Sequence, residues 1–254
     1  MNADSSVGAR PTASATPTPT SRRTLLRFGL TGAAALGATA ALGAAPASAT
    51  PPSTATSRRR PETPDEALRE LAAGNRRWRT FRERHPHESP AVRQSLTSGQ
   101  HPFALVLGCI DSRVPPELVF DQGLGDLMTV RSAGEVLDEA VLGSVAYGVL
   151  ELDIPLVLVL GHQSCGAVKA AVEADESGAS LPAHIQYIAD QIDPYIDHTT
   201  EGDARVDATI DANVRAIRGR LAAEPDLAAK IATGGLAVVG ARYDLTDQRV
   251  RRLA

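Results

Sequence analysis

This chain of 254 residues contains few cysteines, few aromatic residues and little net charge, and each shortage excludes a class of protein. It contains only two cysteines, Cys109 and Cys165, which allow one disulfide bond at most and exclude a disulfide-dense scaffold. Aromatic residues make up only 4% of the chain, so a core must be built mainly from Ala, Leu, Val and Ile. The formal net charge is only −4, which gives no electrostatic reason to expect a nucleic-acid partner. With 43% hydrophobic and 22% charged residues, the composition is that of an ordinary globular protein.

The first 49 residues have the pattern of an export signal. The pair Arg22-Arg23 precedes an uncharged stretch, residues 28–45, that holds eight Ala, four Gly and only three Leu, which is weakly hydrophobic for a retained membrane anchor. Ala47-Ser48-Ala49 matches the small-residue pattern of a cleavage site. We predict a twin-arginine signal peptide over residues 1–49 that is read by the twin-arginine export machinery. Cleavage near Ala49 would give an extracellular, periplasmic or cell-envelope protein with no stable membrane span.

The folded domain is expected to follow a short leader. Residues 50–62 are mostly Pro, Ser, Thr and Arg, which is typical of a flexible segment. At Thr63 the pattern changes, because Thr63 and Glu66 form a capping box around Pro64 at the first helical position. The sequence therefore predicts a domain over residues 63–254 that begins with a helix.

Short apolar runs alternate with helical patterns through this domain. Continuous apolar runs are typical of strands buried on both faces of a parallel sheet. They occupy residues 103–108, 127–130, 156–161 and 236–240. Helical patterns occupy residues 139–150, 167–174, 183–192 and 204–223. We therefore predict an α/β fold with a mainly parallel central sheet flanked by helices.

Two of these runs end in residues that can bind a metal. Cys109 follows Gly108 at the end of the first run, and His162 follows Gly161 at the end of the third, with Cys165 three residues later. The carboxyl ends of parallel strands meet at one edge of a sheet, so we expect the three side chains to converge. Thiolate and imidazole ligands suit zinc, and three protein ligands leave a fourth position open.

Simpler interpretations of the same residues stay open at this point. The two cysteines could form a Cys109–Cys165 disulfide in an exported protein. Cys109 alone could be a small buried hydrophobic residue, and Asp111 and Arg113 could be an ordinary surface ion pair. A phosphatase-like nucleophile is disfavoured, because only three residues separate Cys109 from Arg113 and such a loop is too short to surround a phosphate.

The motif Cys109-x-Asp111-x-Arg113 with His162-x-x-Cys165-Gly resembles the signature of β-class carbonic anhydrases. The resemblance covers roughly residues 63–247 and extends through the segments 120–123, 130–134, 141–144 and 239–241. It implies an α/β fold, a homodimer or larger assembly, and one catalytic zinc per chain bound by Cys109, His162 and Cys165. It also implies that Asp111 either pairs with Arg113 or becomes the fourth zinc ligand. Gln122 and Gly166 are implied to line the substrate pocket.

The chemistry expected of such a site is the reversible hydration of carbon dioxide to bicarbonate. Zinc lowers the pKa of a bound water to roughly 7 and gives hydroxide near neutral pH. Asp111, held by Arg113, would accept a hydrogen bond from that hydroxide and orient it, and Arg113 would keep Asp111 ionised and off the metal. If Asp111 bound zinc instead, no water position would remain.

Two other functions compete with this hypothesis. A carbonyl sulfide or carbon disulfide hydrolase would keep the same fold and metal, and only a direct assay with each substrate would distinguish it. A non-enzymatic exported binding protein with a Cys109–Cys165 disulfide would bind no zinc and would show no free thiols.

Overall fold

The computed structural model describes residues 59–254, and the expected signal peptide, residues 1–49, lies outside this range. The expected leader is described only from Arg59 onward, where Arg60 donates a hydrogen bond to the carbonyl of Pro102. Within the described range no helix is long and apolar enough to cross a membrane.

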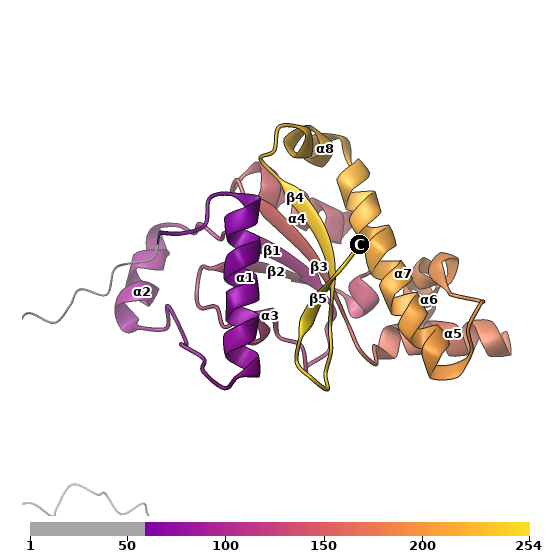
Figure 1. Ribbon diagram of the computed structural model, residues 1–254. Coiled ribbons are helices and arrows are strands. Elements are labelled where there is room, and N and C mark those ends of the chain that lie inside the picture. The colour runs from indigo at the N-terminus through magenta and orange to yellow at the C-terminus, as the bar shows by residue number, and fades with distance from the viewer. Residues whose placement is uncertain (1–58) are drawn as a thin grey trace, which may run out of the picture. The chain divides into compact units, whose positions relative to one another are not determined.

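A five-stranded sheet forms the centre of the domain (Figure 1). Its order is β2-β1-β3-β4-β5, and the first four strands are parallel while the last pair is antiparallel. The strands are β1 (Ala104–Gly108), β2 (Leu127–Arg131), β3 (Leu156–His162), β4 (Ala237–Tyr243) and β5 (Val250–Leu253). The prediction of a mainly parallel sheet is therefore confirmed.

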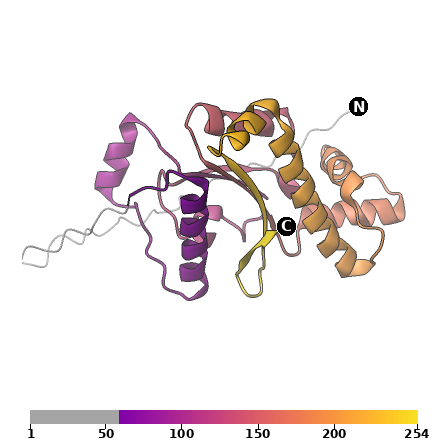
Figure 2. The same cartoon turned by 45° about the horizontal axis from the view of Figure 1, so that its top comes forward.

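Helices cover both faces of the sheet because the buried strands alternate their side chains between two apolar clusters. Leu156, Leu158 and Leu160 of β3 pack on the α1 side, whereas Val157 and Val159 pack on the side of α4, α7 and α8 (Figure 2). The helices are α1 (Pro64–Arg79), α2 (Pro90–Ser95), α3 (Pro116–Val119), α4 (Glu139–Leu150), α5 (Gly166–Ser177), α6 (Ile185–Ile192), α7 (Gly202–Ala223) and α8 (Pro225–Ala232). Short 3₁₀ turns occupy Leu96–Ser98, Ala133–Glu135 and Asp193–Tyr195.

Local signals explain where the first helix begins and how closely the helices approach the sheet. The Thr63 side chain accepts a hydrogen bond from the Glu66 amide and the Glu66 carboxylate accepts one from the Thr63 amide, so the predicted capping box is present. Gly161 lets α7 pack directly on β3, because a Cβ at that position would lie 2.5 Å from a methyl carbon of Val214.

The C-terminal part of the chain contains elements that the apolar pattern did not predict. Helix α8 and strand β5 are additional, and β4 extends three residues beyond the expected run. Strand β5 has the sequence Val-Arg-Arg-Leu and pairs at the edge of the sheet, so it lacks the continuous apolar run of a strand buried on both faces. The expected helix at 167–174 runs from Gly166 to Ser177.

Candidate metal centre

Three buried side chains converge at the carboxyl ends of β1 and β3. Cys109 directly follows β1, His162 is the last residue of β3, and Cys165 immediately precedes α5. The two strands are neighbours in the sheet, with Gly108 opposite Leu160, so their ends lie side by side. The ligand atoms of all three residues lie within 4.8 Å of one another, and all three residues are buried. The sequence prediction that these residues meet is therefore confirmed.

The arrangement fits a tetrahedral metal site. The two Sγ atoms are 3.9 Å apart, close to the roughly 3.8 Å that two thiolates about 2.3 Å from one zinc ion subtend in a tetrahedron. The Nδ1 atom of His162 lies 2.9 Å from the carbonyl oxygen of Gln163, which leaves Nε2 as the atom available to a metal. Nε2 is buried and has no hydrogen-bond partner. A buried polar atom without a partner is costly, and a bound metal would satisfy it.

The cysteines are free thiols. An Sγ–Sγ distance of 3.9 Å is far longer than the roughly 2.05 Å of a disulfide bond. The alternative of a Cys109–Cys165 disulfide is therefore not what this structure contains. The pKa of Cys109 is lowered to about 4, mainly because the Cys165 thiol donates a hydrogen bond to it, and the pKa of Cys165 is correspondingly raised. One thiolate is thus already favoured, and a metal ion would displace the remaining proton.

Asp111 and Arg113 form a pair beside this cluster. Arg113 donates from Nε to Oδ1 at 2.9 Å and from a terminal nitrogen to Oδ2 at 2.7 Å, and its backbone amide also donates to Oδ1. These hydrogen bonds lower the pKa of Asp111 to about 2, so the carboxylate is ionised at neutral pH. Asp111 Oδ2 lies 3.9 Å from His162 Nε2. The carboxylate therefore borders the cluster while it is bound by Arg113.

Arg131, at the end of β2, holds the loop that carries Cys109 and Asp111. Its Nε donates to the carbonyl of Cys109 and a terminal nitrogen donates to the carbonyl of Asp111, both at 2.8 Å. The backbone amide of Gly134 points at the Cys109 sulfur at 3.4 Å, and Asn213 of α7 donates to the Gly134 carbonyl. Sequence reasoning assigned no role to Arg131, although the register that places Arg131 opposite Gly108 follows from the parallel pairing of β1 and β2.

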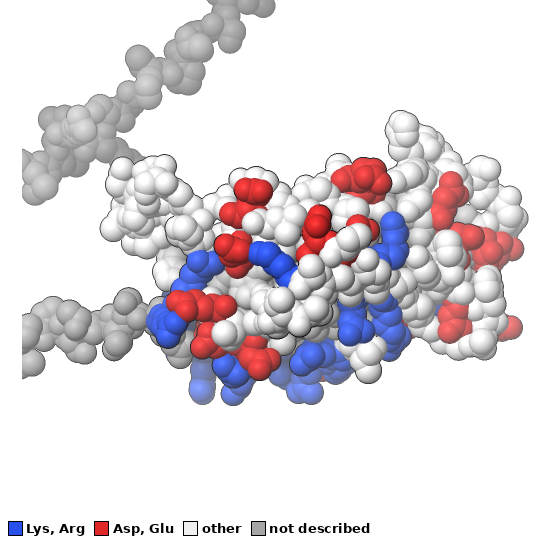
Figure 3. All heavy atoms as spheres, turned by 90° about the horizontal axis from the view of Figure 1, so that it is seen from above, with Lys and Arg blue, Asp and Glu red and all other residues white. Residues whose placement is uncertain are grey.

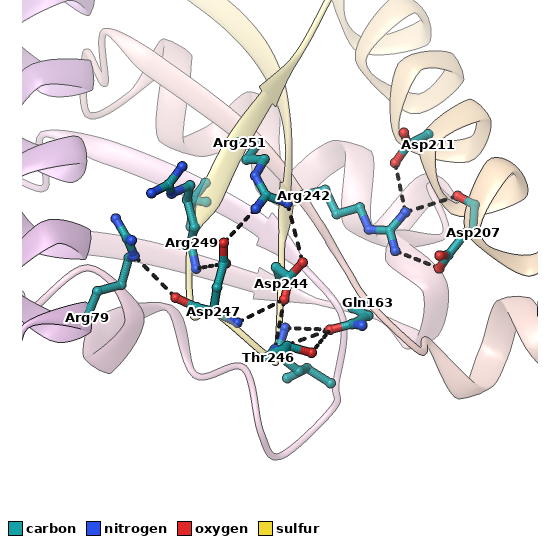
Figure 4. Close-up of polar contacts among 12 residues, drawn as sticks. Arg79, Gln163, Asp207, Asp211, Arg242, Asp244, Thr246, Asp247, Arg249 and Arg251 are labelled. Atoms are coloured by element: carbon teal, nitrogen blue, oxygen red, sulfur yellow. Dashed lines mark hydrogen bonds and ion pairs between the residues drawn. The ribbon is translucent and has the colours of Figure 1, made fainter. Parts of the chain in front are cut away.

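Gln163 connects the loop between His162 and Cys165 to the turn between β4 and β5. Its carbonyl oxygen contacts His162, and its side-chain oxygen accepts hydrogen bonds from the amides of Leu245 and Thr246 in the turn between β4 and β5 (Figure 4). The turn therefore supports the residue that fixes the orientation of the His162 ring. Nothing in the local sequence predicts this contact, because it joins residues about 80 positions apart.

Glu135 is a third group that the sequence did not single out. It is only 1% exposed, its Oε1 atom has no hydrogen-bond partner, and its backbone lies in the left-handed region with φ of 54°. Burial raises its pKa well above the ordinary value, and the nearby negative charge of Cys109 raises it further. Both effects favour the protonated, neutral form of Glu135 beside the cluster.

The two residues predicted for a substrate pocket occupy different places. Gly166 begins α5 directly after Cys165, and there is open space where its Cβ would lie. Gln122 donates its side-chain amide to the carbonyl of Phe120 and lines a separate cavity of about 400 Å³ near α1 and α2. None of Cys109, His162 and Cys165 lines that cavity. Gly166 is therefore adjacent in sequence to the metal cluster, whereas Gln122 lines a cavity that none of the three cluster residues lines.

The chain matches known proteins over nearly all of the described domain. The sequence profile of the carbonic anhydrase family matches residues 104–250. "Carbonic anhydrase 2" of Mycobacterium tuberculosis is 42% identical over 188 residues, which is 73% of this chain and 91% of that protein. The carbonic anhydrase of Mycolicibacterium smegmatis is 42% identical over 189 residues, covering 74% of this chain and 92% of the relative.

Solved structures share the fold. A β-carbonic anhydrase of Coccomyxa, solved with acetazolamide, is 26% identical with a TM-score of 0.56, over 73% of this chain and 86% of that chain. One of two tetrameric β-carbonic anhydrases of Sordaria macrospora has a TM-score of 0.60 at 23% identity, over 74% of this chain and 96% of that chain. Together with the Cys109–His162–Cys165 cluster, these similarities establish that the chain belongs to the β-class carbonic anhydrase family.

Proposed function

We propose that this protein interconverts carbon dioxide and bicarbonate at a zinc site formed by Cys109, His162 and Cys165, with one zinc ion per chain. The observation that carries this proposal is the buried, unpartnered Nε2 of His162 beside two free thiol sulfurs 3.9 Å apart. Zinc bound there supplies Lewis-acid chemistry and lowers the pKa of a coordinated water.

The Asp111–Arg113 pair is placed to orient the water that attacks carbon dioxide. The Asp111 carboxylate is ionised and can accept a hydrogen bond at Oδ2 from the water that attacks carbon dioxide. Arg113 occupies both carboxylate oxygens, which holds Asp111 in place and prevents it from turning toward the metal ligands. Arg113 also donates to the Ser164 carbonyl, so the pair is anchored to the loop that carries Cys165.

A combined metal and activity measurement tests the proposed function. Purified protein should contain one zinc per chain and should hydrate carbon dioxide in stopped-flow assays, and removal of zinc by a chelator should abolish the activity reversibly. Parallel assays with carbonyl sulfide and carbon disulfide identify the substrate. Faster hydrolysis of either sulfur compound than hydration of carbon dioxide would contradict the proposal, as would full activity without metal.

We propose that two chains associate through the edge of the sheet formed by β2. Among the strands of residues 59–254, β2 pairs only with β1, and four of its five residues are half-buried in the single chain. Large apolar side chains are exposed at Ile110, Leu118, Leu124 and Tyr147. The two β-carbonic anhydrases of Sordaria macrospora are described as tetrameric, which supports an oligomer here. Sedimentation should show a dimer or larger species, and Tyr147→Glu should shift it toward monomer; a wild-type monomer would contradict the proposal.

We also propose that residues 1–49 direct export through the twin-arginine route. The support is the Arg22-Arg23 pair, the weakly apolar stretch after it and the Ala47-Ser48-Ala49 pattern. Replacing Arg22 and Arg23 with lysine should trap the precursor inside the cell. Undiminished export of that variant would contradict this route.

A further inference from the structure

A second cavity lies away from the metal cluster, between α1 and the hairpin formed by β4 and β5. Its volume is about 660 Å³, which is within the range of sites for small organic molecules. Its floor is apolar and includes the buried side chains of Leu71, Phe120 and Leu158. None of Cys109, His162 and Cys165 lines it. The proposed reaction therefore leaves this cavity without a role.

Arginine side chains surround the opening of the cavity. Among the described residues that line it, Asp65 is the only acidic one, and the basic ones are Arg69, Arg76, Arg79, Arg249 and Arg252. Figure 3 shows Lys and Arg gathered along its lower edge, which is the side that faces the viewer in Figure 1, where α1 and β5 lie. Like charges gathered around one opening repel one another unless an anion compensates them.

Two arginines near the cavity, Arg242 and Arg251, do have acidic partners. Arg242 binds Asp207 and Asp211, and Arg251 binds Asp244 and Asp247 (Figure 4). Within residues 59–254 no ion pair joins any of the five arginines at the cavity to an acidic side chain. Arg79 contacts Asp247 only through the backbone carbonyl.

The two kinds of arginine alternate along β5. Val250 and Arg252 line the cavity, whereas Arg251 lies between them in the sequence and binds acids outside it. Successive residues of a strand point to opposite faces, so one face of β5 carries a paired arginine and the other an unpaired one. This alternation makes Arg251 a matched control for Arg252.

We propose that the cavity binds an amphiphilic anion, namely a molecule with a carboxylate or phosphate head and a hydrocarbon body. The arginines supply planar forks that match the oxygens of either head group. A small inorganic anion would engage the rim but leave the apolar floor uncovered, so the hydrocarbon body is part of the inference. The site is independent of the proposed carbon dioxide chemistry.

Calorimetric titration tests this site on the full zinc-containing protein. The main probe is sodium dodecanoate below its micellar concentration. Acetate and inorganic phosphate test the anionic head group without a hydrocarbon chain, and dodecyl maltoside tests a hydrocarbon chain without charge. Dodecanoate should bind, and Arg69→Gln combined with Arg252→Gln should weaken it by about tenfold or more. Arg251→Gln and Arg93→Gln remove the same charge elsewhere and should leave its affinity unchanged.

Phosphatidylglycerol vesicles distinguish a bilayer lipid from a dissolved amphiphile. Co-sedimentation with vesicles that is lost in the double variant would show that the ligand is a lipid of a membrane surface. Binding of dodecanoate without binding of vesicles would show that the ligand is a dissolved amphiphile. Either result supports the site. Absence of dodecanoate binding, equally tight binding of acetate, phosphate or dodecyl maltoside, or equal effects of Arg251→Gln and of the double variant would overturn it. A smaller oligomer of the double variant in sedimentation would also overturn it, because a second chain would then cover the cavity.

Discussion

Arginine serves different purposes at the metal cluster and at the cavity beside α1. At the cluster, Arg113 and Arg131 direct their donors onto the Asp111 carboxylate and onto backbone carbonyls. At the cavity, Arg69, Arg76 and Arg252 have no acidic partner within the described range. The comparison shows that a paired arginine positions groups already present in the fold, whereas a group of unpaired arginines leaves positive charge available for a ligand.

The largest expected effect is at the metal ligands themselves. Cys109→Ser, His162→Ala and Cys165→Ser should each reduce zinc affinity by more than about 100-fold, because even supporting residues outside the ligand set typically contribute 10–100-fold. Carbon dioxide hydration should be lost with the metal. Elemental analysis after dialysis measures zinc, and His184→Ala, an exposed histidine elsewhere, should retain it. Full zinc content in any two of the ligand variants would disprove the assignment.

Asp111 should be required for fast hydration of carbon dioxide but not for zinc binding. Asp111→Asn should keep zinc but slow hydration by about 100- to 1000-fold, since an amide N–H₂ group can meet the attacking water with a donor instead of an acceptor. Asp65→Asn changes the carboxylate at the arginine cavity and should leave the rate unchanged. Stopped-flow rates at matched zinc content compare the two. Similar rates for wild type and Asp111→Asn would remove Asp111 from the mechanism.

Arg131 should affect metal affinity by an intermediate amount. Arg131→Gln removes the two hydrogen bonds that hold the Cys109 loop, and we expect zinc affinity to fall by about 10- to 100-fold. Arg252→Gln makes the same substitution at the cavity and should leave zinc affinity unchanged. Competition with a chromophoric chelator measures both. Equal zinc affinities of wild type and Arg131→Gln would show that the loop holds its position without this side chain.

The Asp111–Arg113 pair should contribute a small, pH-dependent share of stability. The pKa of Asp111 is lowered to about 2, mainly by hydrogen bonds from the Arg113 side chain. The stabilisation is therefore present above the unfolded-state pKa near 4 and is lost as pH falls toward 2. Because the Arg113 side chain is 53% exposed, the contribution should stay below about 1 kcal/mol.

Urea unfolding of metal-free wild type and Arg113→Gln between pH 7 and pH 2 measures this contribution. The difference in free energy of unfolding should shrink as the pH falls. Glu83→Gln, which alters an acid with no ion pair among residues 59–254, serves as the control. A difference that grows on acidification would reverse the inferred sign.

The smallest expected effect is on the free energy of unfolding, when an arginine at the cavity is replaced in the absence of ligand. Arg76→Gln should raise the free energy of unfolding by about 0.2–0.5 kcal/mol at low salt, because Arg76 and Arg79 are like charges three positions apart on α1. The gain should vanish near 1 M salt, where charges are screened within about 3 Å. Arg251→Gln, which loses two acidic partners, should be destabilised instead. Lower stability of Arg76→Gln at both salt concentrations would contradict the comparison.

Much of the fold follows from local patterns. The continuous apolar runs predicted β1 to β4, and the Thr63–Glu66 capping box predicted the start of α1. Strand β5 could not be predicted in this way, because Val250–Leu253 contains two arginines and is held by pairing with β4. Pairing at an edge needs backbone hydrogen bonds and tolerates charged side chains.

The sequence by itself predicted the cluster of Cys109, His162 and Cys165, because they follow two buried strands whose carboxyl ends lie at the same edge of a parallel sheet. It also determined the Asp111–Arg113 pair, whose members are two residues apart. Only the tertiary structure decided that Gln122 faces a cavity other than the metal cluster and that Arg131 holds the Cys109 loop. It alone assembled arginines from α1 and β5 around one opening. These contacts join segments far apart in the chain, and their geometry depends on helix packing and strand register, which no local pattern specifies.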